Sequence, residues 1–189
     1  MVETPHGSTI GAGKLTYEDL LNTPDDGKRY EILDGDLVVT PSPITNHQRV
    51  SRDLEFILHA YVKERGLGEV FYAPIDVILD KHTIVVPDIV YVSAARAHLV
   101  QKHGIVGAPD LLVEILSPST KHRDRGVKAK LYARFGVDEY WIVDPDERVL
   151  TRFSLREDRY VEVSRHTDDD VVSTPLFPEL AIQLEKVWA

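Results

Sequence analysis

Apolar runs separated by polar, helix-like segments predict an α/β protein. Residues 111–116 form an uninterrupted apolar run apart from one acid, bounded by Pro109 and Ser117-Pro118, which is typical of an interior strand. Residues 139–143 form a second such run, and residues 123–135 between them show helical spacing closed by Gly136. A strand, helix, strand order predicts a crossover connection and therefore a parallel strand pair.

The remaining pattern predicts further strands and helices around this unit. Asp34-Gly35 between the apolar runs 30–33 and 36–39 is a strong hairpin signal. Residues 46–65 have apolar positions at helical spacing, with Gly66 as a natural stop. Other elements are expected as a short helix capped by Thr16 and ending at Leu21, strands over 69–72, 75–80, 83–86 and 89–92, a short helix over 94–102, a hairpin of 148–155 and 159–164, and a short element over 181–187.

Length and composition favour one domain. The 189 residues suffice for a sizeable core, so we expect a loose lead-in over residues 1–13 and a single domain over 14–189. No apolar stretch reaches the roughly 20 residues that cross a bilayer, and no secretory signal is visible. The absence of cysteine excludes thiolate chemistry, and a cytoplasmic location without membrane association is expected. A net charge of −9 argues against an indiscriminate grip on nucleic acid.

Glu114 is the first candidate for chemistry, because it interrupts the apolar run 111–116. An ionised carboxylate left unpaired in an interior strand would cost several kcal/mol, so it needs a metal, a cation or a proton. Asp88 follows Pro87 at the start of the run 89–92, and two such acids on adjacent strands could share a divalent cation. The plainer alternatives are that Glu114 faces solvent at a strand edge and that Asp88 caps a turn.

A lysine is expected to join these acids. At 100° per residue, the buried stripe of the helix over 123–135 contains Val127, Leu131, Tyr132 and Phe135. Lys128 and Asp124 fall inside this stripe, whereas Lys130, Arg123 and Arg134 fall on the opposite side. The alternative is an ordinary ion pair of Lys128 with Asp124 one turn away. Two carboxylates and a lysine suit phosphodiester hydrolysis with Mg²⁺ or Mn²⁺, in which the metal polarises the phosphate and activates water.

Three motifs resemble one known family, the Uma-two endonuclease-like proteins of the PD-(D/E)XK nuclease superfamily. They are Pro87-Asp88, the string Glu114-Ile115-Leu116-Ser117-Pro118-Ser119-Thr120, and the string Glu139-Tyr140-Trp141-Ile142-Val143-Asp144-Pro145. Tyr30-Glu31 and His47 also match the N-terminal pattern of the family, and the resemblance covers about residues 15–188.

The resemblance implies a restriction-endonuclease-like core, with a central mixed β-sheet flanked by helices, and DNA as substrate. It implies that Asp88, Glu114 and the backbone carbonyl of Ile115 bind the metal, with Glu31 as a further acid in the site. The superfamily places a lysine two positions after the second acid, but residue 116 here is leucine. In this family the lysine comes from the following helix, which in this chain is Lys128.

Other features leave alternatives open. His47 is either a core histidine or a phosphate contact, and Arg125 and Arg123 could meet phosphate or simply solvate the helix. Glu31 could instead lie on the surface of its hairpin. The whole chain could be a non-catalytic binding or assembly module that keeps the scaffold, or a hydrolase of smaller phosphoesters. A homodimer would suit cleavage of two strands, although no residue pattern establishes one.

Overall fold

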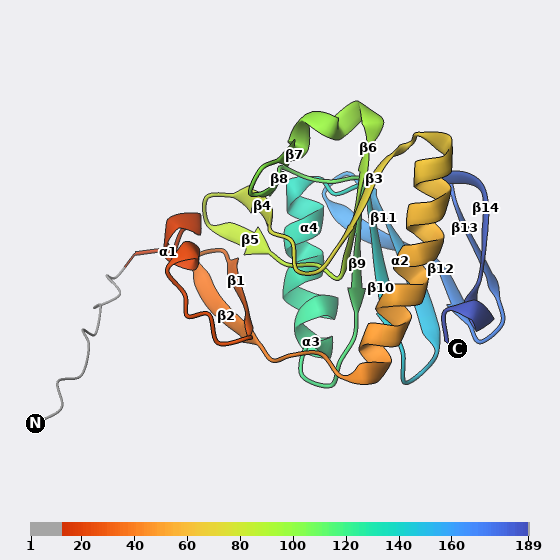
Figure 1. Cartoon of the computed structure of the whole chain (residues 1–189), viewed down its shortest axis with the longest axis horizontal. Coiled ribbons are helices and arrows are strands. Elements are labelled where there is room, and N and C mark those ends of the chain that lie inside the picture. The colour runs from red at the N-terminus through yellow and green to blue at the C-terminus, as the bar shows by residue number, and fades with distance from the viewer. Residues whose placement is uncertain (1–12, 189) are drawn as a thin grey trace, which may run out of the picture.

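A six-stranded mixed sheet forms the centre of the molecule. The protein was studied as a computed structural model that describes residues 13–188 (Figure 1). In this sheet β9 and β10 are parallel neighbours, and every other neighbouring pair is antiparallel. The strands lie in the order β12 (Arg159–Thr167), β11 (Val149–Arg156), β10 (Glu139–Asp144), β9 (Leu111–Ile115), β6 (Ile89–Ser93) and β3 (Gly68–Tyr72).

Helices cover the two faces of this sheet, which confirms the expected α/β architecture. Helix α2 (Thr45–Arg65) lies on one side of the central strands and α4 (Ala129–Phe135) on the other (Figure 1). The side chains of β9 alternate between the two cores, as the pleat of a strand requires: Val113 packs in the α2 core and Leu112 in the α4 core. Glu114, two residues after Leu112, therefore points toward the α4 side.

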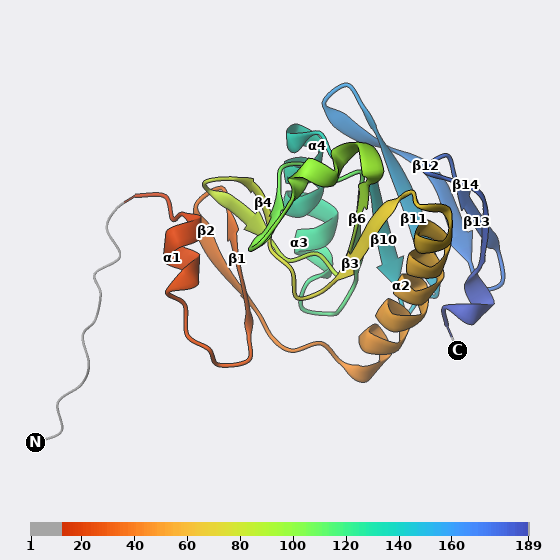
Figure 2. The ribbon, with the colours of Figure 1, turned by 45° about the horizontal axis from the view of Figure 1, so that its top comes forward.

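A second sheet packs against the α4 core, and Figure 2 shows its β1–β2 hairpin beside α3 and α4. Its first hairpin turns at Asp34 and Gly35, both with positive φ, as the sequence predicts. Helix α1 (Tyr17–Leu21) covers this hairpin through Leu20. The strands lie in the order β2 (Asp36–Thr40), β1 (Arg29–Leu33), β5 (Thr83–Val85), β4 (Val77–Asp80), β8 (Gly104–Val106) and β7 (Val100–Gln101).

The crossover helix between β9 and β10 contains one wide turn. It begins as α3 (Lys121–Arg123), widens to a π-helical segment over Asp124–Lys128, and continues as α4 to Phe135. Leu131 and Tyr132 are buried as predicted, but the prediction for Val127 was wrong, because its side chain is 51% exposed. A uniform 100° spacing does not hold through a π turn, so the residues around it change face relative to the regular helix.

Two further predictions were wrong in detail. The helix expected over 94–102 is a short 3-10 helix over Ala94–Leu99, and the chain then forms the small hairpin of β7 and β8. Gly104 lets β8 pass close to the backbone of Asp76, because a Cβ at this position would lie 2.5 Å from the Asp76 carbonyl oxygen. The tail forms a hairpin of β13 (Val171–Thr174) and β14 (Phe177–Gln183), followed by a 3-10 turn over Leu184–Lys186.

Two expectations concern chain organisation. The lead-in over residues 1–13 lies, apart from Gly13, outside the described residues. Among the helices of residues 13–188, none combines the length and the apolar character that crossing a bilayer requires.

The packing of α2 yields a first testable prediction. Leu58→Ala removes a fully buried side chain from the α2 core and is expected to lower the free energy of unfolding by about 2–5 kcal/mol. Phe56→Ala on the same helix removes a larger side chain that is 69% exposed, so its effect is expected to stay within about 0.5 kcal/mol. Urea unfolding of both variants checks this, and equal losses would contradict the placement of α2.

Candidate active site

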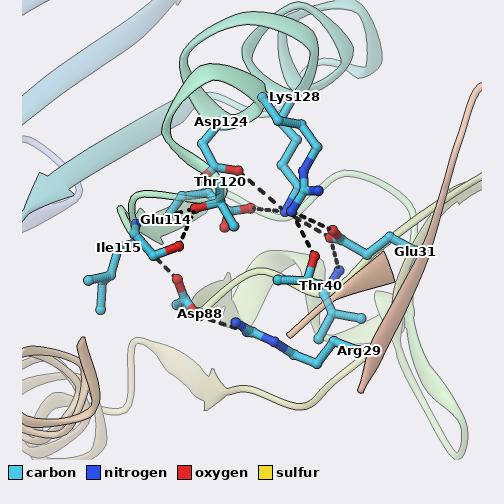
Figure 3. Close-up of polar contacts among 12 residues, drawn as sticks. Arg29, Glu31, Thr40, Asp88, Glu114, Ile115, Thr120, Asp124 and Lys128 are labelled. Atoms are coloured by element: carbon cyan, nitrogen blue, oxygen red, sulfur yellow. Dashed lines mark hydrogen bonds and ion pairs between the residues drawn. The ribbon is translucent and has the colours of Figure 1, made fainter. Parts of the chain in front are cut away.

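Side chains from both sheets and from the crossover helix meet in one cavity of about 260 Å³. Figure 3 shows Lys128 and Asp124 entering from the helix, Glu114 and Asp88 from the central sheet, and Glu31 with Arg29 from β1. The sequence places these residues in segments up to 99 positions apart, and the stacking of the two sheets brings them together. The cavity is lined by Arg29, Glu31, Thr40, His47, Asp88, Glu114, Ile115, Ser117, Thr120, Arg123, Asp124 and Lys128, among others.

Lys128 is the centre of the cluster. Its Nζ lies 2.8 Å from Oε1 of Glu114 and 2.8 Å from Oε1 of Glu31, and 3.9 Å from Oδ1 of Asp124. The residue is only 2% exposed. Burial by itself would lower the pKa of Lys128, but the facing carboxylates outweigh it and raise the pKa above its usual value. Lys128 is therefore a buried ammonium ion that bridges β1, β9 and the π segment.

Glu114 is held in a strongly negative environment. Its Oε1 accepts hydrogen bonds from Lys128 at 2.8 Å and from the hydroxyl of Tyr132 at 2.6 Å. Burial, which Lys128 offsets in part, and the nearby charges of Asp124, Asp88 and Glu31 raise the pKa of Glu114 to about 8. Lys128 keeps its charge even when Glu114 is protonated, because Glu31 and Asp124 also face it.

Asp88 is oriented by three donors. Its Oδ1 accepts from Arg29 at 3.0 Å, and its Oδ2 accepts from the backbone N–H of Ile115 at 2.8 Å and from Nε2 of His47 at 3.1 Å. Burial would raise the pKa of Asp88, but the hydrogen bond from His47 and the charges around it hold the pKa below its ordinary value. Asp88 is thus an ionised carboxylate fixed against the end of β9.

Glu31 is buried, at 2% exposure, and does not lie on the surface of its hairpin. Its Oε1 accepts from the backbone N–H of Val86 at 2.9 Å, and its Oε2 lies 3.7 Å from Arg123. Glu31 therefore stands on the far side of Lys128 from Glu114 and helps to hold the ammonium group between them.

With this geometry in place, comparison with known proteins identifies the family. A family model described as "Uma2: Putative restriction endonuclease" matches residues 16–185. The chain belongs to the Uma2 family. The match confirms the resemblance carried by the Pro87-Asp88 motif and the strings that begin at Glu114 and Glu139. No curated protein matches the chain.

A solved structure has the same fold. It is described as the "crystal structure of a putative nuclease belonging to DUF820 from Anabaena variabilis ATCC 29413", and it matches with a TM-score of 0.75 at 21% sequence identity. The match covers 92% of this chain and 97% of that one. It confirms the predicted nuclease-like α/β core with its central mixed sheet.

Residue 116, where the sequence has leucine, contributes no group to the cavity. Leu116 is 5% exposed and packs in the α4 core. Lys128, 14 residues after Glu114, reaches that carboxylate from the crossover helix instead. The ammonium group and the two acids therefore come from different elements of the fold.

The donor set of this Uma2 site fits a hard divalent cation. Carboxylate and carbonyl oxygens are the ligands that Mg²⁺ prefers, and Mg²⁺ usually keeps several waters. Oδ1 of Asp124 is buried and has no hydrogen-bond partner among the described residues, and burial together with the neighbouring carboxylates raises the pKa of Glu114 to about 8. Within residues 13–188, no group of three or more Asp, Glu, His or Cys side chains is arranged to hold one metal ion.

Three contacts in the Uma2 site were missed by sequence reasoning. Arg29 stands two positions before Glu31 on β1, so the alternation of a strand places both on one face, and this signal was available. Tyr132 was assigned to the core, but its hydroxyl also donates to Glu114. Arg123 was assigned to the solvent side of the helix, which was wrong: it lines the cavity and donates to the Thr40 hydroxyl at 2.7 Å.

Two candidates from the sequence take other positions. His47 is buried and its Nε2 donates to Asp88, which agrees with a core histidine that has a hydrogen-bond partner, and the residue also lines the cavity. Arg125 is not brought into the cavity with the acids: its guanidinium lies 3.3 Å from Asp144, and it lines a separate cavity beside Tyr140. The π turn aims Arg123 inward and Arg125 away.

The environment of Glu114 yields a prediction for pH and stability. The folded protein holds the pKa of Glu114 at about 8 against a reference value of 4.5, so stability gained from the bound proton is lost as the pH rises between these values. Glu114→Gln cannot ionise. Its stability relative to the unmodified protein is therefore expected to increase from pH 5 to pH 8.5 in urea unfolding with EDTA present.

The matched control is Glu64→Gln, because the side chain of Glu64 is 75% exposed. This variant is expected to change stability equally at both pH values. A stability difference for Glu114→Gln that does not grow with pH would show that Glu114 does not carry the buried charge described here.

Proposed function

We propose that this protein is a divalent-metal-dependent endonuclease that hydrolyses phosphodiester bonds in DNA. The observation that carries the proposal is the ammonium group of Lys128 held 2.8 Å from Glu114, in one cavity with the fixed carboxylate of Asp88. Two acids and a cation are the groups that metal-assisted phosphodiester hydrolysis requires. The Uma2 membership and the nuclease-like fold support the same reaction class.

Asp88, Glu114 and the backbone carbonyl of Ile115 are the proposed ligands for Mg²⁺ or Mn²⁺. A bound divalent cation supplies Lewis-acid polarisation of the phosphate and a water of lowered pKa. The chain prepares this site by orienting its acids. Arg29 and His47 orient Asp88 through hydrogen bonds. Tyr132 donates to Oε1 of Glu114, and Oε2 of Glu114 accepts no hydrogen bond from the described residues.

Lys128 acts as a cation and not as a base. Its pKa is raised by the surrounding carboxylates, so it keeps its proton at neutral pH and cannot accept one from water. An ammonium group has three N–H donors, which suits it to orient the attacking water or to stabilise negative charge that develops on the phosphate. Glu31 serves by keeping this ammonium group in place.

A second candidate is a binding module that retains the nuclease scaffold without activity. Both oxygens of Asp88 already accept hydrogen bonds from the protein, which favours this alternative. In the module, Lys128, Arg29 and Arg123 would neutralise the acids permanently, and no metal would bind at millimolar concentration. Titration calorimetry with Mn²⁺ separates the two candidates.

Activity is expected to depend on three residues of the cavity. Asp88→Asn, Glu114→Gln and Lys128→Gln are each expected to lower metal-dependent cleavage of a plasmid by about 100-fold or more, because each removes a charge that the reaction uses. EDTA is expected to abolish cleavage. The matched control is Lys130→Gln, an exposed lysine on the same helix, which is expected to cleave like the unmodified protein.

Circular dichroism shows whether each variant is folded. The near-isosteric Asp88→Asn and Glu114→Gln keep the test informative if Lys128→Gln is unstable. Metal-dependent cleavage that persists undiminished in both folded carboxylate variants would refute the assignment. Cleavage of mononucleotide esters but not of plasmid or oligonucleotide would point to a hydrolase of smaller phosphoesters.

A further inference from the structure

A second cavity adjoins the candidate active site and has no role in the proposed hydrolysis. It measures about 320 Å³ and lies between the outer face of the first turns of α2 and the end of β3. One wall is a stripe of α2 at helical spacing, and the opposite wall is Tyr72 with Ala73. The stripe consists of Gln48, Ser51, Arg52 and Glu55.

The two cavities meet at one group of residues. Arg29, Pro43, His47 and Asp88 line both of them. Asp88 and its hydrogen-bonded partners therefore form a partition with the active site on one side and the second cavity on the other. The second cavity therefore lies next to the place where a phosphate of a polymer would meet the proposed metal ligands.

Tyr72 indicates which class of ligand the cavity binds. Tyr72 is 64% exposed at the end of β3, and its hydroxyl makes no hydrogen bond with the described residues. An exposed aromatic ring at the wall of a polar cavity is a stacking surface, and a nucleobase can stack on it whatever its sequence. Stacking requires no positive surface, which suits a chain with a net charge of −9.

The polar lining suits the edges of a base. Gln48 and Ser51 offer both donors and acceptors, and Glu55 offers acceptors. Arg52 lies at the rim, where it contacts Asp53 at 2.7 Å and 2.8 Å and is 67% exposed. Its guanidinium can exchange this exposed contact for a phosphate at little cost, since surface ion pairs contribute little.

We infer that the second cavity binds an unpaired nucleobase next to the scissile phosphate, with Tyr72 stacking on it. This inference rests on the proposed function and narrows its substrate to nucleic acid with at least one unstacked nucleotide at the cleavage site. A base within an intact duplex is already stacked and paired on both sides, so entering the cavity would require it to leave the helix at a cost of a few kcal/mol.

The test is fluorescence anisotropy with a labelled 12-nucleotide single strand and with its duplex, using Ca²⁺ in place of Mg²⁺. The unmodified protein is expected to bind the single strand more tightly than the duplex. Tyr72→Ala is expected to raise the Kd for the single strand by about 5- to 100-fold, as the loss of one stacked base implies, and to change the duplex Kd less than about twofold. Tyr72→Phe keeps the ring and is expected to behave like the unmodified protein.

Phe56→Ala is the control for loss of an exposed aromatic side chain, because Phe56 is 69% exposed and lines neither cavity. The inference is overturned if Tyr72→Ala binds the single strand like the unmodified protein, or if the unmodified protein shows no preference for it. A different result would contradict the proposed function alone: Tyr72→Ala weakens binding of the single strand, but the unmodified protein cleaves no nucleic acid in the presence of a divalent metal.

Discussion

The structure depends on one buried cation among buried acids. Lys128 brings a full positive charge into the interior between the two sheets, where it would be strongly unfavourable without partners. Glu31 and Glu114 each lie 2.8 Å from its Nζ, so the first hairpin, the central sheet and the crossover helix are tied together at one atom. Removing Lys128 would leave these buried carboxylates without the ammonium group that they share.

The burial of four carboxyl groups in this cluster connects structure to function. Burial, which Lys128 offsets only in part, and the neighbouring acids raise the pKa of Glu114 to about 8, and an oxygen of Asp124 has no hydrogen-bond partner among the described residues. Proteins accept such unfavourable arrangements mainly at functional sites. A bound divalent cation would stabilise the ionised form of Glu114, and this is the physical reason for proposing a metal beside Asp88 and Glu114.

Sequence patterns predicted the elements that carry the site better than the contacts within it. The apolar run around Glu114 and the crossover helix are local patterns, so they could be recognised. The helical wheel placed Lys128 inward correctly but failed for Val127 and Arg123, because no sequence signal revealed the wide turn over Asp124–Lys128. Strand alternation places Arg29 on the same face as Glu31, but its contact with Asp88, 59 residues away, forms only when the two sheets stack.

The most direct test of this account is anomalous diffraction from a crystal of the protein soaked in Mn²⁺. We expect one strong peak in the first cavity, within about 2.5 Å of carboxylate oxygens from both Asp88 and Glu114, with the ammonium group of Lys128 beside it. Peaks confined to the surface, with the cavity acids still paired to Lys128 and Arg29 at saturating metal, would contradict the account.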